Sequence, residues 1–234
     1  MMGILKNILI LIIVLNFGLI HSQPEHIIYS PYSDSMINNT NVNTDSIFNF
    51  ILSNEHLIDF NDCNICKSRA HILSRVIEKK FEGVNILKVW LIADCKRSSQ
   101  KEYYRYKQNY YLRLPGKCSN WVYHVAPAAL INGDTVVFDP ATQNKPVSLK
   151  KWTEKLLEPG GSAYLIIKEN EYYYYPESSD NYFLDETADW NTDEPKMKDE
   201  RYLRSIDDVL RAKQGYYEPW KFNYYMSELM KLIE

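Results

Sequence analysis

The chain has 234 residues, with 27 Lys and Arg against 30 Asp and Glu, so its formal net charge is −3. This balance excludes the strongly basic signature of a nucleic-acid-binding protein. A hydrophobic content of 45% excludes a wholly disordered chain. The length suits one domain with appended segments. Four cysteines are too few for a disulfide-dense scaffold, but they allow two bridges, or one bridge and a reactive thiol.

Residues 1–22 have the pattern of a secretory signal peptide. Lys6 gives a positive start, and the apolar run over residues 8–20 is short for a bilayer of roughly 30 Å. We therefore expect a secreted or periplasmic protein, in a compartment where disulfides persist. Residues 23–60 follow as a leader or arm, which we expect to be poorly structured over its Asn- and Ser-rich part, 23–50.

The main helix is predicted over residues 66–82. Apolar residues spaced three and four apart give it one buried face, formed by Ala70, Leu73, Ile77 and Phe81. Polar residues that can cap a helix lie just upstream, at Asn61, Asp62 and Asn64.

A change of pattern after this helix predicts a sheet. Segments rich in Val, Ile, Tyr and Trp predict strands over residues 84–92, 104–112, 121–130, 135–139 and 163–168, with a possible continuation at 172–175. The turn signal Asn132-Gly133-Asp134 pairs two of them as an antiparallel hairpin. With a short helix at 149–157, these elements predict an α+β catalytic core over residues 61–170, in which the main helix packs on an antiparallel sheet.

The last part of the chain differs in composition. Residues 171–200 hold ten acidic residues against two lysines, which is typical of a solvated acidic loop or linker. Residues 201–234 return to a helical pattern that Gly215 and Pro219 interrupt. We expect a C-terminal helical extension there.

Cys66 stands where the main helix begins. The positive end of the helix dipole and the free N–H groups of the first turn favour a thiolate, the nucleophilic form of cysteine. The same N–H groups can receive an oxyanion. Cys66 is therefore our candidate nucleophile. His71 lies about 140° around the helix from it, and we expect His71 to be structural.

His124 and Asp139 complete a candidate catalytic set. His124 lies in an otherwise apolar strand, and Asp139 ends the next strand of the hairpin. An antiparallel pair can bring the carboxylate beside the imidazole, holding the ring so that its other nitrogen faces a thiol. A Cys, His and Asp set of this kind is typical of cysteine-dependent acyl transfer.

Other interpretations of the cysteines remain open. The spacing Cys63-x-x-Cys66 also suits a half-cystine pair, a redox motif or half of a zinc site. Cys95 and Cys118 bracket a Tyr- and Lys-rich segment, and a bridge between them would contribute about 3 kcal/mol in the loop-entropy model. We predict that bridge, which leaves Cys63 either free or paired with a partner that the sequence does not identify.

Several of these segments resemble the bacterial protein-glutaminases, also called protein-glutamine deamidases. The resemblance rests on Cys66-Lys-Ser-Arg-Ala-His71, Lys80-Phe81, Asn85-Ile-Leu-Lys88, Trp121-x-Tyr123-His124-Val-Ala126, Phe138-Asp139-Pro140, Pro146-Val147 and Trp152. It covers about residues 66–152.

The resemblance implies a transglutaminase-like or papain-like core with Cys66 as nucleophile, His124 as base and Asp139 as its orienting acid. It implies hydrolysis of glutamine side-chain amides in proteins or peptides, without metal or cofactor. Trp121 and Tyr123, in the same segment as His124, are expected to contact substrate. We expect a monomer with no nucleic-acid partner and, once the signal peptide is removed, no membrane contact.

Three other functions fit the same residues. A transglutaminase would pass the acyl group to a lysine amine, and a cysteine protease would attack a backbone amide. A secreted, disulfide-bonded binding protein would use its 19 tyrosines as an adhesive surface and would have no free thiol.

Overall fold

The computed structural model describes residues 26–29, 37–93, 112–114, 118–121, 123–157, 162–169, 205–212 and 219–233. The predicted signal peptide, most of the segment between Cys95 and Cys118, the continuation at 172–175 and the acidic segment 171–200 lie outside these residues. Within the described part of the chain, no helix is long and apolar enough to cross a bilayer.

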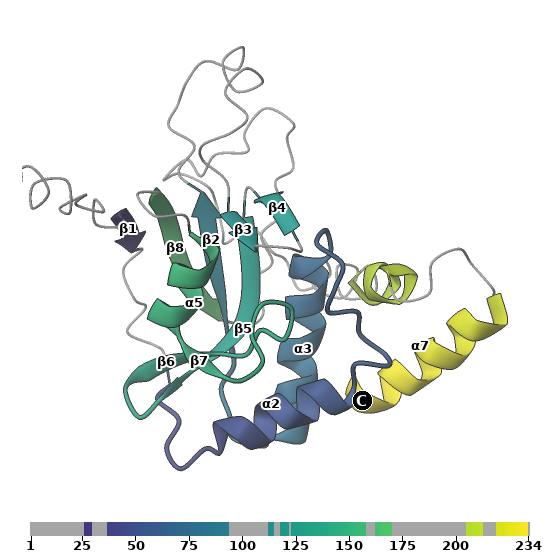
Figure 1. The fold of residues 1–234 in the computed structure, drawn as a ribbon. Helices are drawn as coiled ribbons and strands as arrows, with labels where there is room; N and C mark the ends of the chain where they lie inside the picture. Colours follow the sequence, from purple (N-terminus) through teal and green to yellow (C-terminus); the bar gives the residue numbers. More distant parts are fainter. Residues whose placement is uncertain are drawn as a thin grey trace, which may run out of the picture.

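A six-stranded sheet forms the centre of the molecule (Figure 1). Its strands, in spatial order, are β1 (His26–Tyr29), β8 (Ser162–Glu169), β2 (Leu87–Ala93), β5 (Tyr123–Ile131), β6 (Asp134–Val137) and β7 (Val147–Ser148). β1 runs parallel to β8, and the other neighbouring pairs are antiparallel. A separate small sheet pairs β3 (Leu112–Leu114) with β4 (Cys118–Trp121). The predicted antiparallel sheet is therefore confirmed, with one parallel strand added at its edge.

The predicted hairpin joins β5 to β6. Ile131 faces Asp134, so Asn132 and Gly133 form a two-residue loop. Their φ angles are 52° and 88°, the left-handed values that a type I′ turn requires. Asn and Gly adopt this region most readily, which is why this dipeptide sets the register of the hairpin.

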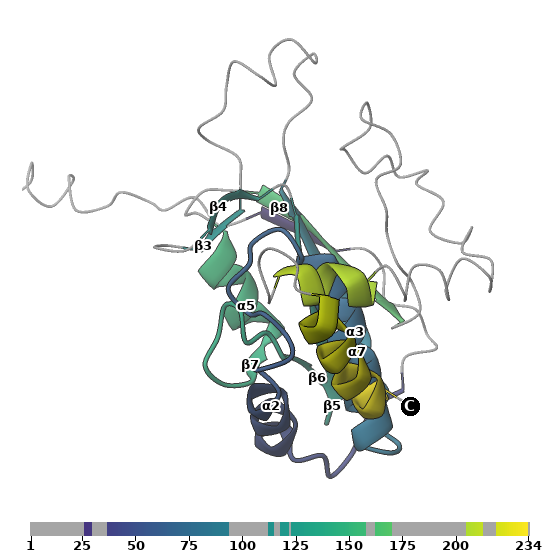
Figure 2. The same cartoon turned by 90° about the vertical axis from the view of Figure 1, so that its right-hand side faces the viewer.

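Two helices cover opposite faces of the sheet (Figure 2). α3 (Cys66–Lys80) packs its Ala70 against Trp90 of β2, and α5 (Leu149–Leu156) packs its Trp152 against Val89 and Leu91. All seven residues of β2 are buried, because its side chains alternate between the two covered faces, and this explains why the strand is apolar except for Lys88. The predicted α+β arrangement is confirmed.

The expected poorly structured arm contains a helix instead. α2 (Thr44–Ser53) begins within the stretch 23–50 and buries Ile47, Phe48 and Ile51 in the same core as α3. Asn43 caps it by accepting a hydrogen bond from the Ser46 N–H at 3.0 Å. The Asn- and Ser-rich composition suggested a loop, whereas these three apolar residues, spaced as on one helix face, decide the structure.

The C-terminal extension is helical over residues 205–212 and in α7 (Pro219–Ile233), as predicted. Ile206, Val209 and Leu210 are fully buried in the cluster that contains the inner face of α3. α3 and the extension also meet through a hydrogen bond, which the Ser68 hydroxyl donates to Asp208 Oδ2 at 2.7 Å. The extension is thus packed on the helix that begins at Cys66.

Candidate active site

Cys66 is the first residue of α3, as the sequence predicts. Its side chain is only 4% exposed, and its thiol is free. The helix has no side-chain N-cap. Asp62, an expected capping residue, accepts instead from the Asn64 N–H at 2.7 Å within the preceding loop. The N-cap residue, Ile65, thus offers no side-chain acceptor to the N–H groups of the first turn.

His124 lies on the part of β5 that β6 does not cover. β6 pairs with residues 128–131 only, after which the Phe138 N–H bonds the Pro127 carbonyl and the chain turns away. The imidazole of His124 is fully buried, with its ring centroid 5.8 Å from that of Trp152 on α5. This open edge of β5 leaves room for side chains from three elements to meet.

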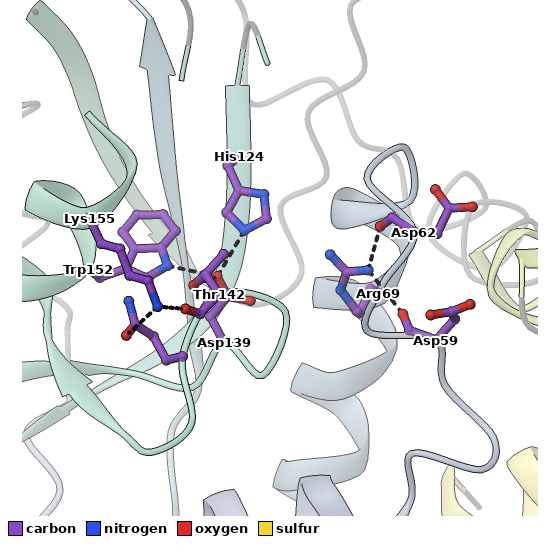
Figure 3. A network of polar contacts seen from close by, with 9 residues as sticks. Asp59, Asp62, Arg69, His124, Asp139, Thr142, Trp152 and Lys155 are labelled. Atoms are coloured by element: carbon purple, nitrogen blue, oxygen red, sulfur yellow. Dashed lines mark hydrogen bonds and ion pairs between the residues drawn. The ribbon is translucent and has the colours of Figure 1, made fainter. Parts of the chain in front are cut away.

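Asp139 follows β6 and holds His124 by a hydrogen bond of 2.9 Å between Nε2 and Oδ2 (Figure 3). The same oxygen accepts from the Thr142 hydroxyl at 2.6 Å and from the Trp152 indole N–H at 2.8 Å. A turn places Thr142, because the Asp139 carbonyl accepts from the Thr142 and Gln143 N–H groups. The carboxylate of Asp139, a residue that is 2% exposed, is thus fixed by three hydrogen bonds.

The three groups titrate as a coupled set. Burial opposes the charge of His124, but the charge of Asp139 and its hydrogen bond outweigh this, with a further contribution from Cys66, and raise the pKa of His124 to about 9. Burial also opposes the charge of Asp139, yet the charge and hydrogen bond of His124 hold its pKa below the ordinary value. The charged forms of both groups are therefore favoured.

The thiol of Cys66 is biased toward its ionised form. Burial would raise its pKa, but a hydrogen bond with His124, the charges of His124 and Arg69, and the backbone N–H of Val125 together lower it. Since Nε2 of His124 bonds Asp139, Nδ1 is the ring nitrogen left for the sulfur. The structure brings together all three predicted residues in the order Cys66, His124, Asp139.

Some residues around this set had no role in the sequence interpretation. Trp152 and Arg69 stood only in the segments that carry the resemblance, and Thr142 was not singled out. Trp152 is separated from Asp139 by a strand and a helix cap, so spacing could not place its N–H on the carboxylate. Thr142 had a weak local signal, because Asp139-Pro140 favours a turn, and a turn brings a residue three positions on back toward the aspartate.

Of the two residues expected to contact substrate, the structure describes the side chain of Tyr123 but not that of Trp121. Tyr123 is half-buried and packs its ring 5.8 Å from that of Trp90, in the apolar cluster that also contains Cys66. Trp121 is described only as the last residue of β4, without its side chain. Tyr123 is thus close to the thiol, on the face of the sheet that α3 covers.

The predicted bridge between Cys95 and Cys118 is wrong in its pairing. Cys63 is disulfide-bonded, while Cys66 is free. The chain has four cysteines, so the Cys63 bond takes one of the two that we had paired with each other. Cys63 packs against the cluster that contains Leu112 of β3, and a contact between segments so far apart in the chain leaves no trace in local spacing.

This bond also bears on the other interpretations of the Cys63-x-x-Cys66 spacing. A redox pair between the two is not formed, and a disulfide-bonded Cys63 has no thiolate to offer zinc. Within the described ranges no group of three or more His, Cys, Asp or Glu side chains is placed to hold a metal ion. His71 lies elsewhere in the core, with its Nδ1 2.8 Å from the Lys88 ammonium.

Comparison with known proteins gives the family. No curated protein matches significantly. A solved protein-glutaminase is similar at 19% identity over 66% of this chain and 80% of its own, with a TM-score of 0.42. A pro-protein-glutaminase is similar at 17% identity over 68% of this chain and 57% of its own, with a TM-score of 0.43. A family model described as Glutaminase matches residues 37–156, just over half of the chain. The chain therefore belongs to the glutaminase family.

Proposed function

We propose that the protein deamidates glutamine side chains in proteins or peptides, releasing ammonia and leaving glutamate. The observation that carries the proposal is the buried set in which His124 bonds Asp139 at 2.9 Å and, together with Arg69, lowers the pKa of the free thiol of Cys66. Membership of the glutaminase family supports the same chemistry. The solved proteins that the chain resembles are named protein-glutaminases, which favours protein substrates.

In the first half-reaction the Cys66 thiolate attacks the side-chain amide carbon of glutamine. The carbonyl oxygen becomes an oxyanion, which the Cys66 backbone N–H at the start of α3 can receive. The imidazolium of His124 gives its Nδ1 proton to the amide nitrogen, the carbon–nitrogen bond breaks, and ammonia leaves. A thioester on Cys66 remains.

In the second half-reaction water replaces ammonia. His124, now neutral, takes a proton from the water through Nδ1 as the oxygen attacks the thioester carbon. The carbon–sulfur bond then breaks, leaving the Cys66 thiolate, the His124 imidazolium and a glutamic acid side chain, which ionises to glutamate by losing its proton to solvent. Asp139 stays ionised throughout and keeps Nε2 of the ring in place.

The electrostatics of the site favour the reactive ion pair. The thiolate–imidazolium form exists between the lowered pKa of Cys66 and the pKa of about 9 at His124. Cys66 also lies in a buried apolar cluster with Trp90, Val125 and Ile166. A low local dielectric strengthens the attraction between the two charges, and we propose that Tyr123 contacts the methylene groups of the substrate there.

The test is ammonia release from a glutamine-containing peptide, with Cys66→Ala and Cys66→Ser as variants. Both should lose activity while keeping the circular dichroism spectrum and melting temperature of the wild type. The product should be heavier by about 1 Da, because oxygen replaces NH on the acyl carbon. Deamidation by the Cys66→Ala protein would overturn the proposal.

The same mass spectra separate the alternatives. Cross-linking to a lysine amine would indicate a transglutaminase, and a broken backbone would indicate a protease. Alkylation of the native, non-reduced protein should label Cys66, in agreement with its free thiol. A protein with no reactive thiol would instead favour the disulfide-bonded binding protein.

We also propose that the protein is exported and acts as a monomer. The pattern of residues 1–22 supports export. A disulfide at Cys63 supports an oxidising compartment. Expression of the full chain with and without residues 1–22, followed by fractionation and size-exclusion chromatography, tests both statements, and retention of the full-length chain in the cytosol would contradict export.

A further inference from the structure

Arg69 has a buried positive charge next to the candidate nucleophile. It lies three residues after Cys66 on α3, on the neighbouring position of the same helix side. Its side chain is only 3% exposed, although arginine is rarely buried without a specific partner. A buried guanidinium at this position requires an explanation beyond packing.

The guanidinium binds the backbone of the loop that leads into Cys66. Its Nη1 donates to the Asp59 carbonyl at 3.0 Å and to the Asp62 carbonyl at 2.9 Å (Figure 3). These two hydrogen bonds from one nitrogen tie residues 59–62 to the first turn of α3. The loop therefore cannot shift without moving Arg69.

The carboxylates of that loop do not neutralise Arg69 directly. Asp59 Oδ1 accepts from the Asn61 N–H at 2.6 Å, and Asp62 Oδ1 accepts from the Asn64 N–H. Among the described residues, Arg69 forms no ion pair with a carboxylate. Its positive charge is therefore left to act on the catalytic groups nearby.

We propose that Arg69 is a positioning residue of this site, which fixes the loop in front of Cys66 and holds a permanent positive charge beside the Cys66, His124 and Asp139 row. This inference rests on the proposed function for the reaction it serves. Arg69 itself touches no reacting atom. It acts through the position of the nucleophile and through the charge state of the thiol.

The electrostatic evidence agrees with this geometry. The charge of Arg69 contributes to lowering the pKa of Cys66, after the contributions of His124, and also contributes to lowering that of Asp139. Two further charged groups lie close by. Lys67 follows Cys66 on α3, and Asp208 of the C-terminal extension bonds Ser68 on the same turn. Neither is among the largest contributions to the shift at Cys66.

The test measures the rate of Cys66 alkylation by iodoacetamide across pH, a readout that needs no deamidase activity. Arg69→Gln removes the charge, and replacement of Arg69 by citrulline removes it while keeping the shape and the N–H donors of the side chain. Both variants should react about tenfold more slowly than the wild type at pH 6 and equally fast once the thiol is fully ionised. Because citrulline preserves the hydrogen bonds to the loop, it gives an answer even if Arg69→Gln does not fold.

Arg69→Lys should separate charge from geometry. It keeps the charge, so the alkylation profile should stay that of the wild type, but it lacks the rigid planar fork of arginine. A looser loop should then lower kcat for ammonia release, by up to about 100-fold if the sulfur moves by 1 Å, with little change in KM.

Lys67→Gln is the matched control, since it removes a cation from the same helical turn. It should leave the alkylation profile and kcat unchanged. An unaltered profile in the citrulline protein would overturn the proposed role of the charge, and an equal change in Lys67→Gln would show a general effect of helix charge. A wild-type kcat in Arg69→Lys would overturn the proposed role in positioning. If Cys66→Ala still deamidates, the proposed function fails while the alkylation result still stands.

Discussion

Replacing Asp139 by Asn tests the electrostatic coupling of the site directly. Asn keeps the size of the side chain and an oxygen that can accept from His124, Thr142 and Trp152, but it has no charge. The charge of Asp139 is the largest of the contributions that raise the pKa of His124. The variant should therefore bring the pKa of His124 down from about 9 without removing the ring from its place.

The size of the effect follows from the shift at His124. Its pKa moves from the ordinary 6.5 to about 9, and at about 1.4 kcal/mol per unit this favours the buried imidazolium by about 3 kcal/mol. Because the folded-state pKa is raised, this stabilisation is fully present below pH 6.5 and is lost as the pH rises through about 9. Asp139→Asn should thus lower the free energy of unfolding by up to about 3 kcal/mol at pH 6, and by much less at pH 10.

Urea unfolding of wild type and Asp139→Asn at both pH values measures this difference, since groups that titrate in both proteins cancel. The alkaline limb of kcat/KM for ammonia release should lie near pH 9 in the wild type and at lower pH in the variant. An equal loss of stability at pH 6 and pH 10, with an unmoved alkaline limb, would refute the coupling between Asp139 and His124.

Three further substitutions test single contacts by urea unfolding. Trp152→Phe keeps an aromatic ring beside His124 but removes the N–H that binds the buried carboxylate of Asp139, and it should lower the free energy of unfolding by about 1.5–3 kcal/mol. No loss would mean that the hydrogen bond is not formed. Gly133→Ala should lower the free energy of unfolding by about 1 kcal/mol, because a residue with a side chain is strained at the φ of +88° found there. Steric clash does not add to this, since no atom lies within 4 Å of the added Cβ. An unchanged stability would show that the turn relaxes. Leu210→Ala should lower the free energy of unfolding by about 2–5 kcal/mol, because it leaves a cavity in the core. Asp207→Ala removes only an exposed ion pair on the same segment and should lower it by at most about 0.5 kcal/mol. Similar losses in both variants would contradict the packing of residues 205–212.

The parts of the fold that the sequence predicts well are those with local signals. The helix at Cys66 has a regular apolar face, and the β5–β6 hairpin is specified by Asn132 and Gly133, whose φ angles are those of the expected turn. α5 begins one residue after Ser148, whose side chain caps it, and it falls within one residue of its predicted bounds. In each case the residues that determine the element lie within it or next to it.

The missed features depend on contacts between distant segments. α2 is held by three apolar residues in a polar stretch, and only the core shows what they pack against. The disulfide partner of Cys63 was unpredictable for the same reason, because four cysteines allow several pairings and spacing does not choose among them. Local pattern therefore predicted elements better than it predicted which elements meet.

The candidate site shows the same division. Cys66, His124 and Asp139 could be identified because each has a distinctive chemical type at the end or edge of a predicted element. The groups that hold these three residues in place could not be identified from the sequence. The Trp152 N–H, for example, reaches Asp139 only because α5 packs on the face of the sheet opposite to α3. Arg69 could be seen in the sequence, but its bonds to two backbone carbonyls have no sequence signature.

The position of Cys66 depends on more of the chain than the family match covers. The match ends at residue 156, yet Val209 and Leu229 of the C-terminal extension are fully buried in the cluster that includes Leu73 and Ile77 of α3. A helix packed on both sides has little freedom to shift, because tightly packed interiors transmit displacements and do not absorb them. His124 lies on β5, and α3 lies between β5 and this extension. The distance between the Cys66 sulfur and the His124 imidazole therefore depends on how α3 packs against β5 and on how it packs against the extension. Changes in residues 205–233 should therefore reach the chemistry at Cys66 through α3, although they lie outside the part of the chain that defines the family.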